Sequence, residues 1–154
     1  APGRYLERVL HTKYISTGST SPHPQLAVAE FMKNGHFEPH LRKMRMQYQR
    51  NRDVMLGWVS RYFPPGTRAS RPQGSFLLWL EMPEGFDSLR LNRALLEQGV
   101  QIAVGSIFSA SGKYRHCLRM NYAAKPTLQI EEAVRKVGVT ACKLLAETVD
   151  HAEQ

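Results

Sequence analysis

The hydrophobic and polar positions of this chain predict helices towards its two ends and short strands between them. Apolar residues recur three or four apart near both ends, whereas apolar runs and alternation mark the middle. Helices are expected over residues 4–14, 25–33, 39–63 and 127–148, and from Asp87 through Gln98. Strands are expected over residues 67–70, 75–81, 100–103 and 116–122. This order predicts an α+β fold in which helices cover one side of a small sheet, preceded by helices that include one long linking helix.

The helix predicted over residues 39–63 carries an apolar seam. Its members are spaced seven apart or fall on the alternate positions between: Leu41, Met44, Tyr48, Met55, Trp58 and Tyr62. Asn51 interrupts the seam, and Pro64 follows the helix and ends it. The seam is too short for a free coiled coil, so it packs on the body of the domain or spans between two bodies.

Two strands have different patterns. Residues 75–81 are almost continuously apolar, which predicts a strand buried on both faces for much of its length. Residues 116–122 alternate instead, so Arg119 shares one face with Cys117 and Asn121.

Arg119 is the first candidate for chemistry. A guanidinium in a half-buried strand is costly unless it meets an anion or good acceptors. Its planar fork suits a carboxylate held by two parallel hydrogen bonds. The alternative is a structural arginine paired with an acid of the same chain. The pattern therefore predicts a carboxylate at Arg119, and leaves open whose carboxylate it is.

Composition places the chain among globular proteins. It has 154 residues, of which 42% are hydrophobic, enough for one ordinary domain with its own core. No apolar run approaches the roughly 20 residues that a membrane helix needs, so no membrane partner is expected. The two cysteines, Cys117 and Cys142, make no zinc pattern and no disulfide framework, which predicts a cytoplasmic protein.

The net charge of +8 is concentrated on the predicted long helix. Between His40 and Tyr62 there are six basic residues and one acid, Asp53, so this segment carries +5. A basic helix is usually a solvated face, but it can also meet a partner such as DNA.

No local motif supplies a complete catalytic unit. Six residues separate Gly105 from Gly112 where a phosphate-binding loop has four, and Tyr114 replaces the hydroxyl residue that binds its metal. His36 and His40 have the spacing of helical metal ligands, but Pro39 between them favours a plain helix start. No metal is therefore expected.

Several segments resemble a known family when taken together. Residues 73–80, 98–105 with Phe108, and 118–122 are similar to the C-terminal part of fold-type I aminotransferases, which use pyridoxal 5′-phosphate (PLP). The segments upstream are most similar to MocR-type regulators of the GntR family, which fuse a winged helix-turn-helix to an aminotransferase-like domain; they are residues 1–5, 24–27 and 35–45. The specificity lies in the order and spacing of these segments, which cover nearly the whole chain.

The resemblance implies roles for individual residues and regions. Arg119 matches the arginine that binds the α-carboxylate of the amino-acid ligand. Thr20 and Ser21 match a loop near the dimer interface and the cofactor. The implied parts are a remnant of the large PLP-binding domain, the helix between the domains, and the small α+β domain; they span residues 1–38, 39–63 and 64–154.

The resemblance also implies a longer protein. The family's Schiff-base lysine and the DNA-binding domain match positions before Ala1. The whole protein is expected to bind PLP and an amino-acid or amine effector, to form a homodimer, and to bind DNA through its winged helix. This chain alone is expected neither to bind PLP covalently nor to catalyse transamination.

Three functions are compatible with these features. The first, favoured by the similarity of residues 1–45, is the sensing domain of a transcription regulator. The second is the tail of a genuine aminotransferase. The third is a module whose basic helix binds nucleic acid or mediates dimerisation.

Overall fold

The computed structural model describes the backbone of residues 3–152 and the side chains of residues 3–148. The helices are α1 (Leu6–Thr17), α2 (Pro22–Lys33), α3 (Phe37–Tyr62), α4 (Ser88–Leu96) and α5 (Leu128–Ala152), with 3-10 helices η1 (Gly3–Tyr5) and η2 (Gly105–Phe108). The strands are β1 (Arg68–Ala69), β2 (Leu77–Glu81), β3 (Ala103–Val104) and β4 (Cys117–Asn121). All the predicted helices and strands are present in the predicted order, with ends shifted by a few residues.

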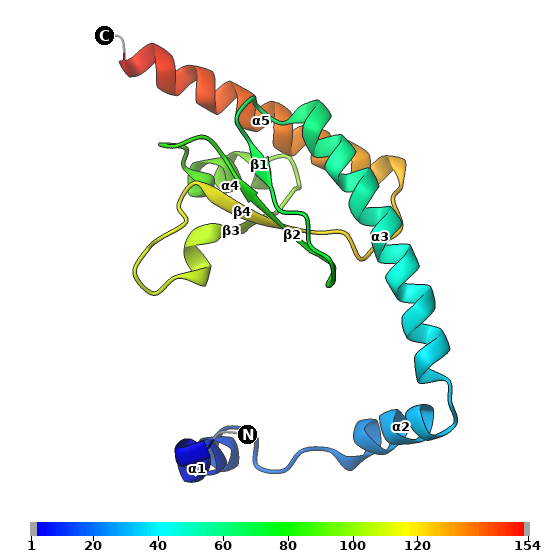
Figure 1. Cartoon of the computed structure of the whole chain (residues 1–154). Coiled ribbons are helices and arrows are strands. Elements are labelled where there is room, and N and C mark those ends of the chain that lie inside the picture. Colours follow the sequence, from blue (N-terminus) through cyan, green and yellow to red (C-terminus); the bar gives the residue numbers. More distant parts are fainter. Residues whose placement is uncertain (1–2, 153–154) are drawn as a thin grey trace. The chain divides into compact units, whose positions relative to one another are not determined.

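The strands form one antiparallel sheet in the order β1-β2-β4-β3 (Figure 1). Strand β4 lies between β2 and β3, and Arg119 on β4 is paired with Trp79 on one side and Ala103 on the other. Arg119 is therefore held from both sides at the centre of the sheet.

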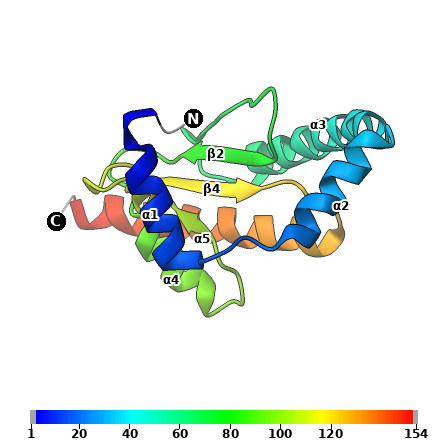
Figure 2. The same ribbon diagram turned by 90° about the horizontal axis from the view of Figure 1, so that it is seen from below.

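Helices α3, α4 and α5 pack on one face of this sheet (Figures 1 and 2). Side chains from all three helices join the inward residues of β2 and β4 in a single core: Met55, Val59, Leu91, Leu95, Val134, Val137, Leu78, Leu80 and Leu118. The predicted α+β class, with helices on one side of a small sheet, is confirmed.

Strand β2 differs from its prediction. Leu78 and Leu80 are fully buried, but Leu77, Trp79 and Glu81 between them are only half-buried. The continuous apolar run therefore does not mean burial on both faces. Trp79 instead packs on aromatic side chains of the face opposite the helices.

The loop predicted over residues 15–24 is shorter in the structure. Helix α1 continues to Thr17, where the side-chain hydroxyl donates to the Lys13 carbonyl, and α2 begins at Pro22. Proline suits the first turn of a helix because its missing N–H would have no partner there. Only residues 18–21 remain outside the helices.

Helix α4 begins as predicted, and its end delays the strand that follows. The Asp87 carboxylate accepts the Leu89 N–H at 2.9 Å, so Asp87 caps the N-terminus of the helix. The Val100 N–H donates to the Leu95 carbonyl, and the Ile102 N–H donates to the Asn92 side chain. Because α4 accepts both N–H groups, the sheet pairing of β3 starts only at Ala103, later than predicted.

The chain divides into two compact units, Ala1–Lys43 and Met44–Gln154. Helices α1 and α2 of the first unit bury none of their residues. The second unit contains the sheet and the core and is called the C-terminal unit below. Within residues 3–152, no helix combines the length and the apolar character that crossing a membrane requires.

Helices α3 and α5 meet at Gly138. A Cβ at this position would lie 2.4 Å from the Tyr62 carbonyl oxygen and 2.6 Å from its carbon. No larger residue fits without moving the end of α3, so Gly138 sets how closely the two helices pack. Tyr62 is also bonded to α5, because its hydroxyl donates to the Glu131 carboxylate at 2.7 Å.

This contact predicts opposite outcomes for two glycines. Gly138→Ala should lower the free energy of unfolding by about 2 kcal/mol, because the added methyl group overlaps backbone atoms of α3. Gly57→Ala should raise it by about 0.5 kcal/mol, since Gly57 is a helical residue of α3 with open space around it. Urea unfolding of both variants and of the parent chain measures the two changes in free energy of unfolding. Equal stability of Gly138→Ala and the parent chain would contradict the close contact.

Candidate functional site

Arg119 lies on the sheet face opposite the helices. Its strand neighbour Leu118 faces the core and is fully buried, so alternation turns Arg119 to the other face, where it is half-buried. The cross-strand partner Ala103 is small, whereas Trp79 on the other side is large.

The Arg119 guanidinium stacks on an aromatic ring. Its central carbon lies 4.3 Å from the centroid of the Phe108 ring. A stacked guanidinium uses its flat face and keeps its N–H donors, which lie in the plane, free for an anion.

Among the side chains of residues 3–148, none forms an ion pair or a hydrogen bond with the Arg119 side chain. The ion pairs of this part of the chain involve other arginines, namely Arg52, Arg68, Arg90, Arg115 and Arg135. No acid among these described side chains is therefore paired with Arg119, and they leave its donors available to a ligand.

Three aromatic side chains surround this position. The Trp79 ring contacts Phe108 at 5.8 Å with an interplanar angle of 67°, and Tyr114 at 5.6 Å with an angle of 90°. Both are edge-to-face arrangements, which favour aromatic pairs. We call Trp79, Phe108 and Tyr114 the aromatic cluster.

Cys117 is no candidate nucleophile on this face. It is fully buried, and this burial is the largest cause of the raised pKa of its thiol. The negative charge of Glu81 raises that pKa further. A thiol with a raised pKa stays protonated near neutral pH and is a poor nucleophile.

A close approach of two backbone segments holds η2 against β4. A Cβ on Gly105 would lie 2.3 Å from the Tyr114 carbonyl oxygen and 2.8 Å from Cβ of Cys117. Within the following loop, the Lys113 N–H donates to the Ser109 hydroxyl at 3.1 Å. Phe108, the last residue of η2, is therefore fixed beside the strand that carries Arg119.

Asn51 joins the long helix to the end of β4. It is a buried polar residue of α3, and its side-chain N–H₂ group faces three carbonyl oxygens, those of Tyr122, Ala123 and Ala124, at 2.9, 3.2 and 3.0 Å. These carbonyls follow β4 directly, so the bonds fix where the strand ends. The interruption of the apolar seam at Asn51 thus has a structural reason that the sequence did not reveal.

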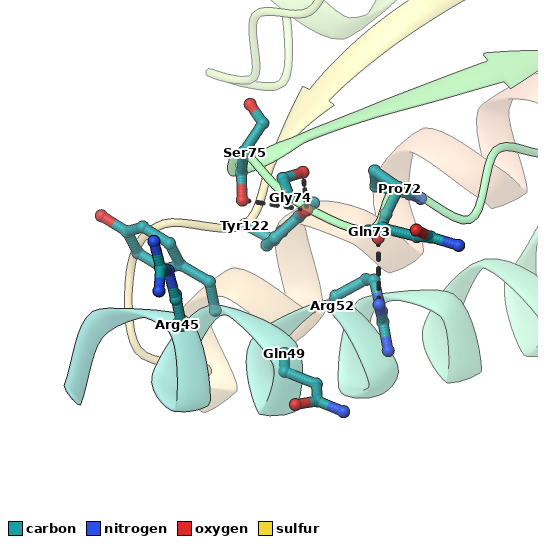
Figure 3. Close-up of a pocket in the computed structure, with 9 residues that line it drawn as sticks. Arg45, Gln49, Arg52, Pro72, Gln73, Gly74, Ser75 and Tyr122 are labelled. Carbon is teal, nitrogen blue, oxygen red and sulfur yellow. Dashed lines mark hydrogen bonds between the residues drawn. The ribbon is translucent and has the colours of Figure 1, made fainter. Parts of the chain in front are cut away.

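Two cavities of the C-terminal unit lie near these residues. One, of 650 Å³, is lined by residues of β4 and α5, by residues 100–103, and by Met55 and Leu77; its polar residues are Gln101, Arg119, Asn121 and Gln129. The other, of 360 Å³, lies between α3 and residues 72–75 (Figure 3). Sequence reasoning found neither, because each is formed by segments far apart in the chain.

The smaller cavity has a polar lining. The Arg52 guanidinium donates to the Pro72 carbonyl, and the Tyr122 hydroxyl donates to the Ser75 carbonyl at 3.2 Å (Figure 3). Arg52 also donates to the Asp53 carboxylate. Arg45, which also lines the cavity, is exposed. The Arg52 guanidinium is therefore already hydrogen-bonded within the chain.

Thr20 and Ser21 lie in the short link between α1 and α2. Both are exposed, and Ser21 precedes α2 without capping it through its side chain. They belong to the first unit, whereas Arg119 belongs to the C-terminal unit. Their predicted place near a cofactor stays a prediction.

The basic residues of α3 are mostly exposed. Arg42, Lys43, Arg45, Arg50 and Arg61 are exposed, while Arg52 is half-buried and paired with Asp53. In the part of the chain that the structure describes, no group of three His, Cys, Asp or Glu side chains could hold a metal ion. The exposed charged side chains of α3 are largely cationic.

Comparisons with known proteins agree with the fold and the earlier resemblance. The family model described as aminotransferase class I and II matches residues 7–137. The chain is 44% identical over 138 residues to the uncharacterized HTH-type transcriptional regulator YjiR of Escherichia coli, covering 90% of this chain and 29% of that protein. It is 32% identical over 141 residues to 2-aminoadipate transaminase of Thermus thermophilus, covering 92% of this chain and 35% of the enzyme.

A solved structure supports the same relationship. The α-aminoadipate aminotransferase LysN of Thermus thermophilus, crystallised with N-(5′-phosphopyridoxyl)-L-leucine, superposes with a TM-score of 0.79 at 32% identity, over 92% of this chain and 36% of that one. The chain thus spans about a third of the length of the relatives it matches. Its similarity both to helix-turn-helix regulators and to aminotransferases, predicted from the sequence, is confirmed.

The geometry at Asn51 predicts a contrast between two asparagines. Asn51→Asp should lower the free energy of unfolding by about 3 kcal/mol, because an acceptor replaces the donor that faces three carbonyls. Asn121→Asp should change it little, since the Asn121 side-chain oxygen already accepts the Ala123 N–H at 2.7 Å and a carboxylate can do the same. Thermal or urea unfolding compares the two variants. Similar losses in both would show that the direction of the Asn51 hydrogen bonds does not matter.

Proposed function

This chain belongs to the class I and II aminotransferase family, and we propose that it forms the C-terminal part of the amino-acid-sensing domain of a bacterial transcription regulator. The match to a helix-turn-helix regulator, at 44% identity over 90% of the chain, supports a regulator. In the whole protein, a winged helix upstream would bind DNA, and PLP and an amino acid would bind to the aminotransferase-like domain.

The observation that carries the proposal is the free guanidinium of Arg119. It lies at the centre of the sheet with its N–H donors unused by the described side chains, stacked on Phe108. A carboxylate is the anion that this planar fork suits best, because two parallel N–H···O bonds form at once. Arg119 would bind the α-carboxylate of the ligand, and so orient the rest of the ligand.

Two residues in the link between α1 and α2 have side chains that fit the phosphate group of the cofactor. Thr20 and Ser21 offer exposed hydroxyl groups that make no hydrogen bond to another described side chain, and hydroxyls are suitable donors to a phosphate. They would help to hold the cofactor. When bound, PLP supplies an aldehyde carbon that reacts with the amino group of the ligand.

The proposal assigns the three parts of the chain to the parts of an aminotransferase. Residues 1–38 would belong to the large domain, 39–63 would be the helix between domains, and 64–154 the small domain. Helices α1 and α2 support this, because they bury none of their own residues yet expose large apolar side chains. These are Leu6, Val9, Leu10, Tyr14, Ile15, Leu26, Val28, Phe31 and Met32. Contacts with the rest of a homodimeric protein would cover them.

A second candidate function is the tail of a genuine aminotransferase. The 32% identity to a Thermus thermophilus transaminase favours it. The same arginine would serve in both, by positioning a substrate in an enzyme or by favouring one conformation in a sensor. In a regulator, binding of an amino acid would change the affinity of the full-length protein for DNA. In an aminotransferase, the bound amino acid would be converted to product.

The full-length, PLP-loaded protein can separate the two functions. We expect its affinity for its own promoter DNA to change when an effector amino acid is added, without sustained conversion of 2-oxoglutarate to glutamate. Gel-shift titrations and a coupled glutamate assay measure the two properties. Steady turnover with no effect on DNA binding would favour the enzyme.

Arg119→Ala in the full-length protein should abolish the response to amino acids and leave PLP binding unchanged. Loss of a bidentate charged hydrogen bond weakens binding by about 3 kcal/mol, or roughly a hundredfold in Kd. Absorbance of the bound cofactor reports both PLP occupancy and the amino-acid titration.

Arg115→Ala is the matched control. Arg115 lies just before the same strand, is exposed, and has a long ion pair of 3.9 Å with Asp87. Its removal should leave amino-acid affinity unchanged. If Arg119→Ala binds amino acids like the parent protein, the proposed carboxylate site is wrong.

A further inference from the structure

We propose that Phe108 is the positioning residue of the amino-acid site, whose ring fixes the plane of the Arg119 guanidinium so that its N–H edge is presented to the ligand's carboxylate. This inference rests on the proposed function of Arg119 and adds the residue through which the arginine is oriented. Phe108, a member of the aromatic cluster, would then contribute to ligand binding as well as to packing.

The geometry of the stack is the first support. The guanidinium carbon lies 4.3 Å from the centroid of the Phe108 ring, well within the range in which a cation is attracted to an aromatic face. Among the described side chains, this ring is the only partner that the Arg119 cation has. Because rotamer freedom is large for arginine, loss of this contact would leave the long Arg119 side chain less restricted.

Phe108 is itself held in place from two directions. The edge-to-face contact of Trp79, at 5.8 Å, restricts its ring from within the sheet. The close approach of Gly105 to Tyr114 and Cys117 fixes the 3-10 helix that ends at Phe108. The Phe108 ring is 39% exposed, but Trp79 packs on it and the close contact at Gly105 holds its backbone, so a side chain stacked on the ring is restricted as well.

Orientation matters because carboxylate binding is directional. Two parallel hydrogen bonds form only when the guanidinium and the carboxylate are nearly coplanar. A guanidinium already fixed in the correct plane loses less conformational freedom when the ligand binds, so its affinity is higher. Phe108 also excludes water from one face of the cation, which strengthens its interaction with an anion.

The test uses the full-length, PLP-loaded protein and two probes that differ by one group. L-leucine carries the carboxylate, and 3-methylbutylamine is the same molecule without it. In Phe108→Leu the Kd for L-leucine should rise about tenfold, the size expected for a lost cation–π contact. The Kd for 3-methylbutylamine and the PLP occupancy should not change, because neither depends on Arg119.

Two further variants test whether Phe108 acts through Arg119. Phe108→Tyr keeps an aromatic face and should bind L-leucine like the parent protein. The double variant Phe108→Leu, Arg119→Ala should bind L-leucine no more weakly than Arg119→Ala alone, because the two residues form one unit. Equal weakening for both probes, or additive losses in the double variant, would overturn the proposal by reducing Phe108 to a packing residue.

The outcomes separate this inference from the proposed function. Loss of L-leucine binding in Arg119→Ala, with parent-like binding in Phe108→Leu, overturns the role of Phe108 and leaves the carboxylate site standing. If Arg119→Ala binds L-leucine like the parent protein, both the proposed carboxylate site and the role of Phe108 are wrong.

A spectroscopic measurement tests the stack without any ligand. In the full-length protein with labelled arginine, the ring current of Phe108 should shift the side-chain signals of Arg119 upfield, and Phe108→Leu should return them to the values of a free arginine. Phe108→Tyr should preserve the upfield shift of the Arg119 signals. Arg119 signals at free-arginine values in the parent protein would overturn the proposal.

Discussion

The hydrogen bonds of the Asn51 side chain connect the long helix to the strand that carries the candidate site. One buried amide, facing three consecutive carbonyl oxygens, fixes where β4 ends and how the sheet lies on α3. A buried polar group is costly unless its partners are in place, so this connection is specific. At the C-terminal end of α3, the contact of Tyr62 with Gly138 sets the approach of α5. The position of Arg119 relative to the helices follows from these two contacts.

The sheet separates two kinds of chemistry on its two faces. The face towards α3, α4 and α5 is filled by aliphatic side chains such as Leu78, Leu80 and Leu118, which are fully buried. The opposite face holds the aromatic cluster and the cation of Arg119. A strand that alternates between these environments holds a charge at the centre of the sheet without burying it in the core. This arrangement accounts for a half-buried arginine that pairs with no acid among the side chains of residues 3–148.

Much of the fold follows from local signals. The helix start at Asp87, the helix over residues 127–148 and the alternation around Arg119 could all be predicted from the sequence, because each depends on neighbours a few residues apart. The tertiary contacts could not be predicted from the sequence. The stack on Phe108, the role of Asn51 and both cavities depend on register and on segments distant in the chain. The apolar run of β2 was misleading for a related reason, since Trp79 is only half-buried and packs on aromatic partners whose positions only the folded structure reveals.

The most direct test of the central claim is a crystal structure of the full-length protein with PLP and its amino-acid ligand. We expect the α-carboxylate to accept two nearly parallel hydrogen bonds of about 2.8 Å from the Arg119 guanidinium, which remains stacked on Phe108. A ligand carboxylate bound by other residues, with Arg119 turned away or paired with an acid, would contradict the account.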